Sequence, residues 1–486
     1  MNAKAVLFVL GNLAIILAGA LIAPLVVAIV YDSGGPHEIH EVKAFGITAS
    51  LTLAVGIILR LVFRDAESKV QVREGFAIVT FAWLLFALFG MLPYLLTGVV
   101  SSTTDAFFET MSGFTTTGAS IFSEVEFLPH GVQFWRCMTQ WLGGMGIVVL
   151  SVALLPVLGV GGYRILKAET PGGVAFERDR PRITDAAKDM WELYLVFSAV
   201  QCFLLVLCGM SPYDAMCHTF TTMSTGGFST HTASVGHFTS PLIQWVIIIF
   251  MVIAGVNFSV HAHFIRGRLK LALLNLEFRF FLYMLTVSVL IGLMVQPTGS
   301  SAEEAIRNIT FQVVSIATST GFATEDFEQW VPLMKFVLVG LMIVGGCMGS
   351  TAGGIKVTRI LVFGKNIIRE LHRMIYPHGV RPLRVGTRVL EPHVGANIMA
   401  FGSLYTLSFV LGTMTMVAYE YDLLSSCTAS LAALSNIGPG LGQVGPAQNW
   451  GHLPDTAKWV MSTLMLMGRL ELFSVVILFS PWVWRR

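Results

Sequence analysis

Long apolar runs alternate with short polar connectors along the whole chain. Two apolar runs, at 5–30 and 43–63, come first, and each is long enough to cross a bilayer as a helix. Four further pairs of runs follow, at 75–98 with 133–158, 187–209 with 241–264, 276–295 with 332–362, and 395–420 with 456–484. The pattern predicts an all-α polytopic membrane protein with two N-terminal transmembrane helices followed by four pairs of spans.

Each pair of spans encloses a run that is too short to cross a bilayer. These runs lie at 105–114, 213–223, 303–317 and 423–434. Asp105 and Glu109, near the start of the first run, favour a helix N-terminus, where negative charge is stabilising. We therefore expect four short helices, each placed between two full spans.

A segment of small hydroxyl or amide residues closed by a glycine follows each short run. The four segments read GFTTTGAS, MSTGGF, ATSTGF and LSNIGPG. Glu109, His218 and Gln312 each stand nine positions before the glycine of the first three segments, which sets the register independently. A recurring unit of this kind indicates an internal repeat. The predicted divisions are 1–70 for the N-terminal helices and 71–165, 166–270, 271–375 and 376–486 for four repeats.

The aligned residues of these segments form what we call the four glycine stretches, at 115–118, 224–227, 318–321 and 435–438. Glycine takes backbone angles that other residues resist, so the chain can turn its carbonyl groups inward. Four sets of carbonyl oxygens around one axis can replace the water shell of K⁺. The predicted selectivity filter comprises Thr115, Thr116, Thr117, Gly118, Ser224, Thr225, Gly226, Gly227, Thr318, Ser319, Thr320, Gly321, Ser435, Asn436, Ile437 and Gly438.

A single cluster of Ser, Thr and Gly is more often a loop turn or a small-residue helix contact. Four clusters in register between apolar spans favour re-entrant loops around a pore, because non-helical backbone at membrane depth must be buried in protein or line a cavity. Ala119, Phe228, Phe322 and Pro439 follow the aligned glycines, so the loops are unequal. We expect cation selectivity that is imperfect between K⁺ and its neighbours.

Composition agrees with a membrane protein. The chain of 486 residues is 54% hydrophobic and 12% charged, about half the charge of a soluble protein. Its six cysteines form no CxxC motif, which argues against a disulfide framework or a zinc site. No phosphate-binding loop, dinucleotide fingerprint or nucleophile elbow is present. Histidines such as His261 and His263 are not spaced as a metal site, so we expect no enzyme and no organic cofactor.

The distribution of charge predicts the orientation. Basic residues gather between the predicted repeats and at the C-terminus, and an excess of Lys and Arg marks cytoplasmic loops. The set comprises Arg164, Lys167, Arg178, Arg180, Arg182, Lys188, Arg266, Arg268, Lys270, Arg279, Lys356, Arg359, Lys365, Arg369, Arg373, Arg381, Arg384, Arg388, Arg485 and Arg486. The connectors around the glycine stretches carry Glu124, Glu126, Glu303, Glu304, Glu325, Asp326 and Glu328. Both termini are therefore expected inside, with an acidic pore mouth outside that concentrates cations.

The third repeat has an unusual second span. Residues 345–354, which we call the glycine-rich loop, read GGCMGSTAGG and form a poor helix, because each glycine costs about 1 kcal/mol. We interpret this segment as an intramembrane loop that obstructs the pore and moves to open it. The alternative is a tight helix crossing made by small residues. The predicted gate comprises Gly345, Gly346, Gly349, Ser350, Thr351, Gly353 and Gly354, with Lys356 as an anchor.

Arg469 lies within the last apolar run, where a charge usually faces a bundle interior or a cavity. Glu471 is two positions away and does not share its helix face, so each needs another partner. We interpret Arg469 as a pore-facing charge that limits cation flux. The alternative is a structural ion pair. Trp135 and Trp141 are expected in an interfacial belt at the outer end of the 133–158 span.

At these residues the chain resembles the superfamily of K⁺ transporters with four pore-loop repeats, and within it the membrane subunits of bacterial Trk potassium uptake systems, of the TrkH/TrkG type. The resemblance is carried by FFETMSGFTTTGAS (107–120), TTMSTGGFST (221–230), SIATSTGFATED (315–326), SNIGPGLG (435–442), GGCMGSTAGGIK (345–356), RILKAETPG (164–172) and GRLELF (468–473). It covers essentially the whole chain.

The resemblance implies a K⁺-conducting homodimer in the bacterial inner membrane. It implies a cytosolic TrkA-type regulatory ring whose nucleotide-binding domains control opening, and it maps filter, gate and pore arginine onto the residues given above. The basic segment 356–388 could bind anionic membrane lipid or a cytoplasmic partner, or it could serve only as a topology signal; no nucleic acid is expected. A H⁺- or Na⁺-coupled K⁺ symporter remains the alternative function. A membrane enzyme would need facing Asp, Glu or His side chains at one depth, and the sequence offers no such cluster.

Overall fold

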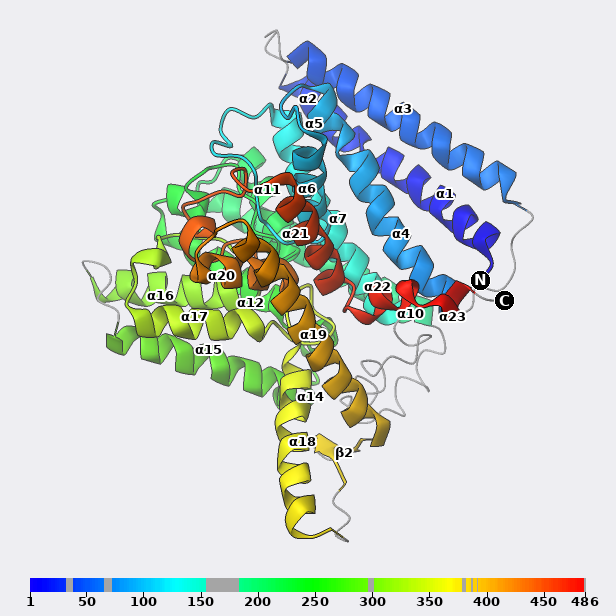
Figure 1. Ribbon diagram of the computed structural model, residues 1–486. Coiled ribbons are helices and arrows are strands. Elements are labelled where there is room, and N and C mark those ends of the chain that lie inside the picture. The colour runs from blue at the N-terminus through cyan, green and yellow to red at the C-terminus, as the bar shows by residue number, and fades with distance from the viewer. Residues whose placement is uncertain are drawn as a thin grey trace.

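The protein is built almost entirely of helices, as Figure 1 shows. The computed structural model describes residues 1–31, 38–64, 72–153, 183–295, 301–377, 382–385, 388–390 and 392–484. Within these residues the only strands are β1 (Arg384–Val385) and β2 (Arg388–Val389), which pair antiparallel. The expectation of an all-α chain is confirmed.

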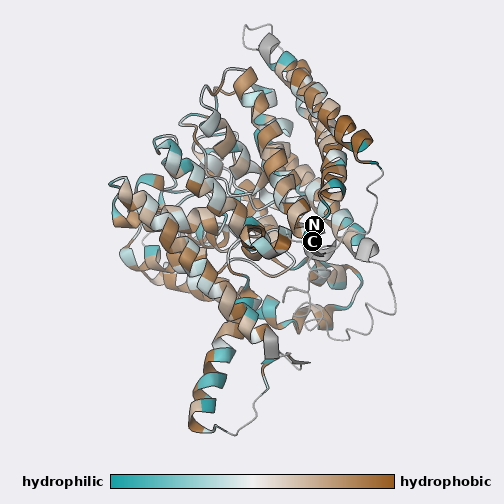
Figure 2. Ribbon diagram, turned by 45° about the vertical axis from the view of Figure 1, so that its right-hand side comes forward, coloured by the Kyte–Doolittle hydropathy of each residue, from teal (hydrophilic) through white to brown (hydrophobic). Residues whose placement is uncertain are grey.

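Six helical segments of the described chain are long and apolar enough to cross a membrane. Figure 2 shows how strongly apolar residues dominate the long helices. Large apolar side chains such as Ile16, Ile29 and Leu61 are exposed on the N-terminal helices, as expected for surfaces that face lipid. The six segments are α1 with α2 (Ala3–Ala20 and Ile22–Val30), α3 (Glu38–Val62), α4 with α5 (Val72–Gly90 and Leu92–Leu96), α10 (Ile183–Leu207), α15 (Leu276–Val295) and α19 (Pro392–Ala418).

Two predicted spans are broken, which corrects the expectation of continuous helices over 241–264 and 456–484. The first consists of α12 (Pro241–Gly255) and α13 (Phe258–Ile265), bent by 106°. The second consists of α21 (Asp455–Arg469) and the segment Phe473–Phe479, which holds α22 (Phe473–Val476) and η5 (Ile477–Phe479), bent by 111°. Asn257 caps α13 by accepting a bond from the amide of Ser259. Glu471 and Leu472 take left-handed backbone angles, which end α21.

Four short helices lie in the interior of the protein, within two residues of their predicted bounds. Each begins at a Ser or Asp whose side chain accepts a hydrogen bond from an amide of the first turn, the usual N-cap arrangement. The cap residues are Ser102, Ser211, Ser301 and Asp422. The helices are α6 (Thr103–Phe114), α11 (Pro212–Met223), α16 (Ala302–Ala317) and α20 (Leu423–Leu434).

The predicted spans at 133–158 and 332–362 have a different character from the lipid-facing helices. α7 (His130–Ala153) carries Gln133, Arg136 and Gln140, all buried, so it packs within the protein and need not be apolar. Trp135 is also fully buried and donates to the carbonyl of Gly90, so its expected place in an interfacial belt is wrong. α17 (Pro332–Ile343) stops before the glycine-rich loop, and α18 (Val357–Ile375) follows it.

The remaining elements are short connectors. They are α14 (Leu269–Leu273), α23 (Pro481–Trp484), η2 (Ser234–His237), η3 (Phe327–Gln329) and η4 (Gly442–Val444). The N-terminus lies near α23 in Figure 1, and α18 projects from the body of the protein. Of the basic residues used to predict orientation, Arg164, Lys167, Arg178, Arg180, Arg182, Arg381, Arg485 and Arg486 lie outside the described residues, as does the 164–172 motif.

Candidate functional site

The four glycine stretches follow directly from the ends of α6, α11, α16 and α20, and their backbones have the same shape. The second residue of each stretch takes a left-handed conformation with φ between 53° and 55°. The fourth is a glycine with φ between 81° and 96°. The second residues are Thr116, Thr225, Ser319 and Asn436, and the glycines are Gly118, Gly227, Gly321 and Gly438. Four dissimilar sequences therefore adopt one conformation.

The amide groups of each stretch bond back to the helix before it. In every stretch the N–H of the third residue donates to the carbonyl five residues upstream. The bonds run from Thr117 to Ser112 at 2.8 Å, from Gly226 to Thr221 at 2.8 Å, from Thr320 to Ser315 at 2.8 Å and from Ile437 to Ala432 at 3.0 Å. Because these amide groups donate to carbonyls of the preceding helices, they do not occupy the carbonyl oxygens of the stretches. Most of those oxygens are therefore available to another partner.

The four stretches touch one another in a closed ring. A Cβ atom added at any of the four glycines would lie less than 3.0 Å from the carbonyl oxygen of the third residue in a neighbouring stretch. The pairs are Gly118 with Gly226, Gly227 with Thr320, Gly321 with Ile437, and Gly438 with Thr117. First meets second, second meets third, third meets fourth, and fourth meets first. A positive φ and this close approach together require glycine at the four positions.

Side chains of the short helices hold the segments that leave the ring. Glu109 accepts bonds from the amide of Ile121 at 2.9 Å and from the hydroxyl of Ser120 at 3.1 Å. His218 Nε2 lies 2.9 Å from Ser229 Oγ. The amide of Gln312 lies 3.2 Å from Thr324 Oγ1, and in the fourth segment Thr428 Oγ1 accepts from the amide of Leu441 at 3.0 Å. Glu109, His218 and Gln312, which set the register in the sequence, thus each contact the segment that follows their own glycine stretch.

Arg136 of α7 connects the exits of the first two stretches, and the sequence reasoning missed it. Its Nε lies 2.5 Å from Glu109 Oε1, and its Nη1 donates to the carbonyl of Ser229 at 3.1 Å. The guanidinium also lies 3.9 Å from the ring centroid of Phe228. Both members of this ion pair are buried. A lone arginine within an apolar run was the available signal, since such a charge needs a partner.

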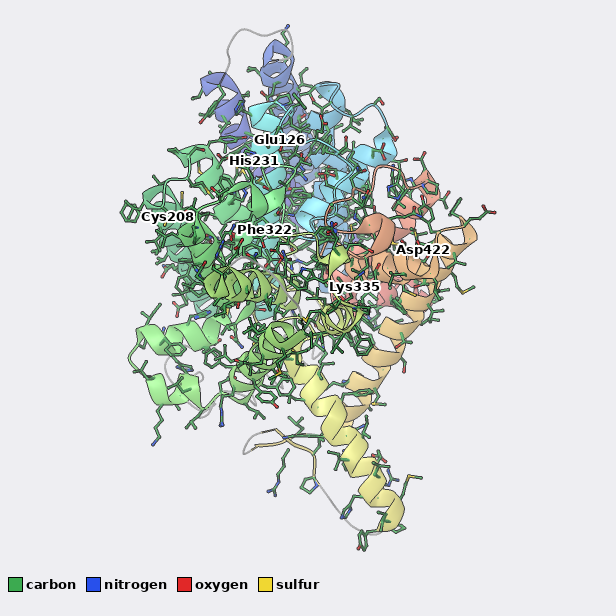
Figure 3. The ribbon with its side chains drawn as sticks, turned by 90° about the vertical axis from the view of Figure 1, so that its left-hand side faces the viewer. Glu126, Cys208, His231, Phe322, Lys335 and Asp422 are labelled. Carbon is green, nitrogen blue, oxygen red and sulfur yellow. The ribbon has the colours of Figure 1, made fainter. Side chains whose placement is uncertain are left out.

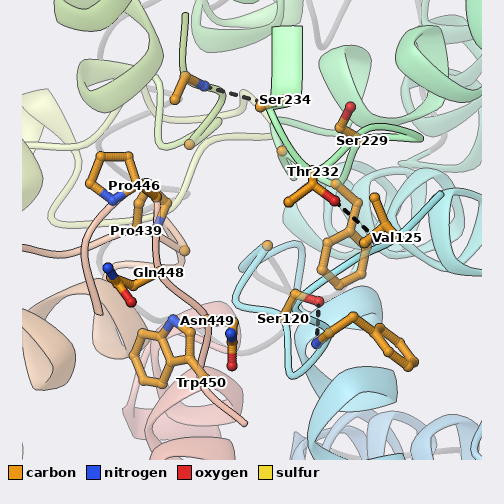
Figure 4. Close-up of a pocket in the computed structure, with 18 of the residues that line it drawn as sticks. Ser120, Val125, Ser229, Thr232, Ser234, Pro439, Pro446, Gln448, Asn449 and Trp450 are labelled. Atoms are coloured by element: carbon orange, nitrogen blue, oxygen red, sulfur yellow. Dashed lines mark hydrogen bonds between the residues drawn. The ribbon is translucent and has the colours of Figure 1, made fainter. Parts of the chain in front are cut away.

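A cavity of about 120 Å³ lies on the side of the ring that the four glycines face. All four ring glycines line it, together with segments on either side of Ser120, Thr232 and Gln448 (Figure 4). Among the described residues that line this cavity, none is Asp or Glu. The acidic residues of the predicted pore mouth therefore lie outside the cavity wall. Two of them, Glu126 and Glu328, accept hydrogen bonds from loop amides.

His231 is the titratable residue of the cavity wall besides Arg136. Its ring stacks on that of His237 with the centroids 3.6 Å apart. Its nitrogens lie 3.9 Å from Glu126 and 3.7 Å from Asp214. Figure 3 shows Glu126 and His231 close together in the upper half of the view. Burial and the neighbouring His237 lower the pKa of His231, so the ring is neutral at pH 7.

The glycine-rich loop lies on the opposite side of the ring, against the first and second residues of the stretches. The amide of Gly353 donates to Ser319 Oγ at 2.5 Å. A Cβ at Gly353 would meet the carbonyl of Ser435, and Thr351 Oγ1 donates to the carbonyl of Met223, just before the second stretch, at 3.0 Å. The loop thus contacts the second, third and fourth stretches or their helix ends.

Arg469, at the end of α21, holds this loop to α7. Its Nη1 donates to the carbonyl of Thr351 at 2.7 Å and its Nη2 to that of Gly143 at 3.1 Å. Glu471 pairs with Arg359 at 2.5 Å and not with Arg469, as their spacing predicts. Lys356 lies at the far end of the loop, where its ammonium donates to the carbonyl of Ala352.

The part of the chain that the structure describes contains no group of three or more His, Cys, Asp or Glu residues that could hold a metal ion. His218 and His261 are hydrogen-bonded to backbone or hydroxyl groups, as expected for structural histidines.

Comparisons with known proteins point in one direction. The family TrkH, described as a cation transport protein, matches residues 41–485. The chain is 39% identical to the Trk system potassium uptake protein TrkH of Escherichia coli K12, over 100% of both chains. It is 32% identical to TrkG of the same organism, over 96% of this chain and 95% of the relative. The crystal structure of the potassium transporter TrkH from Vibrio parahaemolyticus matches with a TM-score of 0.90 and 36% identity, covering 100% of both chains.

Proposed function

Because the chain belongs to the TrkH family of cation transport proteins, we propose that it is the K⁺-translocating membrane subunit of a bacterial Trk-type potassium uptake system. The observation that carries this proposal is the closed ring of four glycine stretches, with a cavity on one side and a glycine-rich loop on the other. The relatives are named as potassium uptake proteins, so we assign K⁺ as the transported ion.

The proposed selectivity filter is the ring itself. K⁺ enters from the cavity, loses its water shell and is coordinated by backbone carbonyls of residues 115–118, 224–227, 318–321 and 435–438. The short helices direct their C-terminal ends at the ring, and the partial negative charge there favours a cation. Asn436 supports this arrangement because its amide donates to Thr117 Oγ1 at 3.0 Å and ties the fourth stretch to the first.

The proposed organisation is four repeats of outer helix, re-entrant short helix and inner helix, at 71–165, 166–270, 271–375 and 376–486, after two N-terminal helices within 1–70. The shared caps, the shared backbone angles and the shared bonds of the third residues support it. Two crossings per repeat keep all connectors between repeats on one side, and the position of α23 near the N-terminus agrees with this.

The proposed gate is the glycine-rich loop, residues 345–354, which blocks the ring from the side opposite the cavity. Opening requires the loop to leave Ser319 and Ser435, and Arg469 restrains it through the carbonyl of Thr351. Glycines provide the freedom for such a movement. Arg469 also places a positive charge beside the path and thereby limits cation flux.

We place the protein in the bacterial inner membrane as a homodimer with both termini in the cytoplasm, controlled by a cytosolic TrkA-type ring that binds nucleotide. Its relatives are named as parts of a Trk system. α18 projects from the body of the protein and carries Lys365, Arg369 and Arg373, which suits a cytoplasmic partner or anionic lipid.

Expression in a strain that lacks its own potassium uptake tests the proposal. The wild-type chain, co-expressed with its regulatory subunit, should restore growth at limiting K⁺, and Gly321→Ser should not. Gly340→Ala is the matched control, because a Cβ at Gly340 meets nothing within 4 Å. Failure of the wild-type chain to restore growth or ⁸⁶Rb⁺ uptake contradicts the proposal. Flux that stops without a Na⁺ or H⁺ gradient would favour the symporter instead.

A further inference from the structure

We propose that Gln140 of α7 is a positioning residue that sets the ion preference of the ring by holding the carbonyl of Gly226. The inference rests on the proposed function, because an ion preference presupposes that ions pass the ring. Gln140 itself contacts the backbone of the second stretch and acts on the ion through it.

The Gln140 amide is bonded at one end to the second stretch and at the other to Phe228, the residue directly after it. Nε2 donates to the carbonyl of Gly226 at 2.7 Å, and Oε1 accepts from the amide of Phe228 at 3.1 Å. The side chain is completely buried. A primary amide that donates to one peptide group and accepts from another two residues later fixes the orientation of the backbone between them. Gln140 therefore clamps the last part of the second stretch onto α7.

The clamp makes the second stretch unlike the others. Of the sixteen carbonyl oxygens in the four stretches, hydrogen bonds from described residues reach two, and both belong to the second stretch. Ser224 accepts from Thr225 Oγ1 at 2.6 Å, and Gly226 accepts from Gln140. At the level of the third residue, the carbonyls of Thr117, Thr320 and Ile437 accept no such bond. One of the four oxygens at this level is thus shared between an ion and an amide.

The sequence carries a matching change. The third residue is Thr117, Thr320 or Ile437 in three stretches and glycine only in the second. Gly226 has no left-handed backbone angle, unlike the residues on either side of it. A Cβ added there would collide with the amide carbon and oxygen of Gln140. This glycine is therefore required by the Gln140 side chain, and the two residues form a matched pair.

A carbonyl oxygen has two acceptor positions, and a donated hydrogen bond occupies one of them. The partially positive hydrogen of the donor also repels a cation, so the oxygen becomes a weaker ligand. A weaker ligand field reduces the advantage of a small ion over a larger one, and the field strength of the carbonyls is one determinant of K⁺ over Na⁺ preference. The clamp also prevents this peptide group from turning to follow a smaller ion. Both effects favour K⁺.

Gln140→Met tests the inference, because methionine keeps the length of the side chain and removes the donor and the acceptor. We expect transport to persist and the K⁺ over Na⁺ preference, measured as a bi-ionic reversal potential, to fall by about 3- to 10-fold, the range that one hydrogen bond supplies. The control is Gln201→Met. Gln201 of α10 is equally buried, and its amide has no hydrogen-bond partner among the described residues.

A rescue experiment tests the matched pair. Gly226→Thr alone should abolish the K⁺ preference because the side chain displaces Gln140, whereas Gly226→Thr with Gln140→Ala should recover transport with a preference close to that of Gln140→Met. An unchanged ion preference in Gln140→Met, or full tolerance of Gly226→Thr beside an intact Gln140, overturns the inference. Absence of K⁺ flux in the wild type and in Gln201→Met would instead refute the proposed function.

Discussion

Alanine substitution at the four ring glycines is expected to damage ion selectivity in a graded order. At Gly118, Gly227 and Gly321 the added Cβ would overlap a neighbouring carbonyl oxygen severely, while at Gly438 it would lie 2.7 Å away. Real Cβ atoms essentially never approach closer than 3.0 Å. The carbonyl must therefore withdraw by roughly 1 Å in the first three variants and by a few tenths of an ångström in Gly438→Ala.

The size of the effect follows from the contact that is lost. Withdrawal of one oxygen from a dehydrated cation resembles loss of a hydrogen bond to a charged group, about 1.5–3 kcal/mol. This corresponds to about a 10- to 100-fold loss of K⁺ over Na⁺ preference. The left-handed φ adds about 1–2 kcal/mol of strain at each site, so the contacts and not the strain determine the order.

Purified variants reconstituted in liposomes, with ⁸⁶Rb⁺ and ²²Na⁺ uptake compared, provide the measurement. Gly340→Ala controls for the substitution itself, because Gly340 lies in α17 with open space around it. Gly438→Ala should retain the largest part of the preference among the four. Equal behaviour of all five variants, or the largest loss in Gly438→Ala, would refute the assignment of these glycines to a carbonyl ring.

Further expectations concern the two sides of the ring. Arg469→Gln should raise ⁸⁶Rb⁺ flux several-fold, because a positive charge beside the path is removed; an unchanged flux would assign Arg469 to structure alone. Deletion of residues 345–354 should raise the leak in the absence of the regulatory subunit, and an unaltered open probability in planar bilayers would exclude the gate. Glu109→Gln leaves Arg136 buried without its counter-charge and should cost about 3–5 kcal/mol of stability, seen as a lower melting temperature in detergent than for the control Glu124→Gln at an exposed site. Uptake should decline at an external pH acidic enough to protonate His231, whose pKa burial and His237 hold below the ordinary value of histidine, because the cavity wall then carries an added positive charge; His231→Asn should lack this decline.

The apolar pattern predicted most of the helices because length and hydropathy govern insertion. The short helices were located within two residues, since polar caps and glycine stretches bound them on both sides. The pattern failed at α12–α13 and at α21–α22, where an apolar run conceals a bend above 100°. Contacts remote in sequence also stabilise the first of these breaks. The carbonyl of Gly255, for example, accepts a bond from Cys347 of the glycine-rich loop.

The repetition of the glycine stretches in the sequence revealed the candidate site. The difference between the second stretch and the other three could not be predicted. Glu109 served as a register mark, but its pairing with Arg136 depends on how α6 packs against α7. Gln140 carries no signal in its own sequence neighbourhood, because its partner, Gly226, is 86 residues away. The hydrogen-bond partners of the acidic connectors also could not be predicted. Carboxylates such as Glu328 bond to loop amides, and local charge counts do not distinguish such a task from cation attraction.

The central claim is that the four glycine stretches jointly hold a dehydrated alkali ion. Anomalous diffraction from crystals of this protein grown with Rb⁺ or Tl⁺ in place of K⁺ tests it most directly. The account predicts ordered peaks on the common axis of the ring, among the carbonyl oxygens of Thr117, Gly226, Thr320 and Ile437. Heavy-ion peaks that appear only elsewhere in the protein, with the centre of the ring empty at saturating ion concentration, would contradict it.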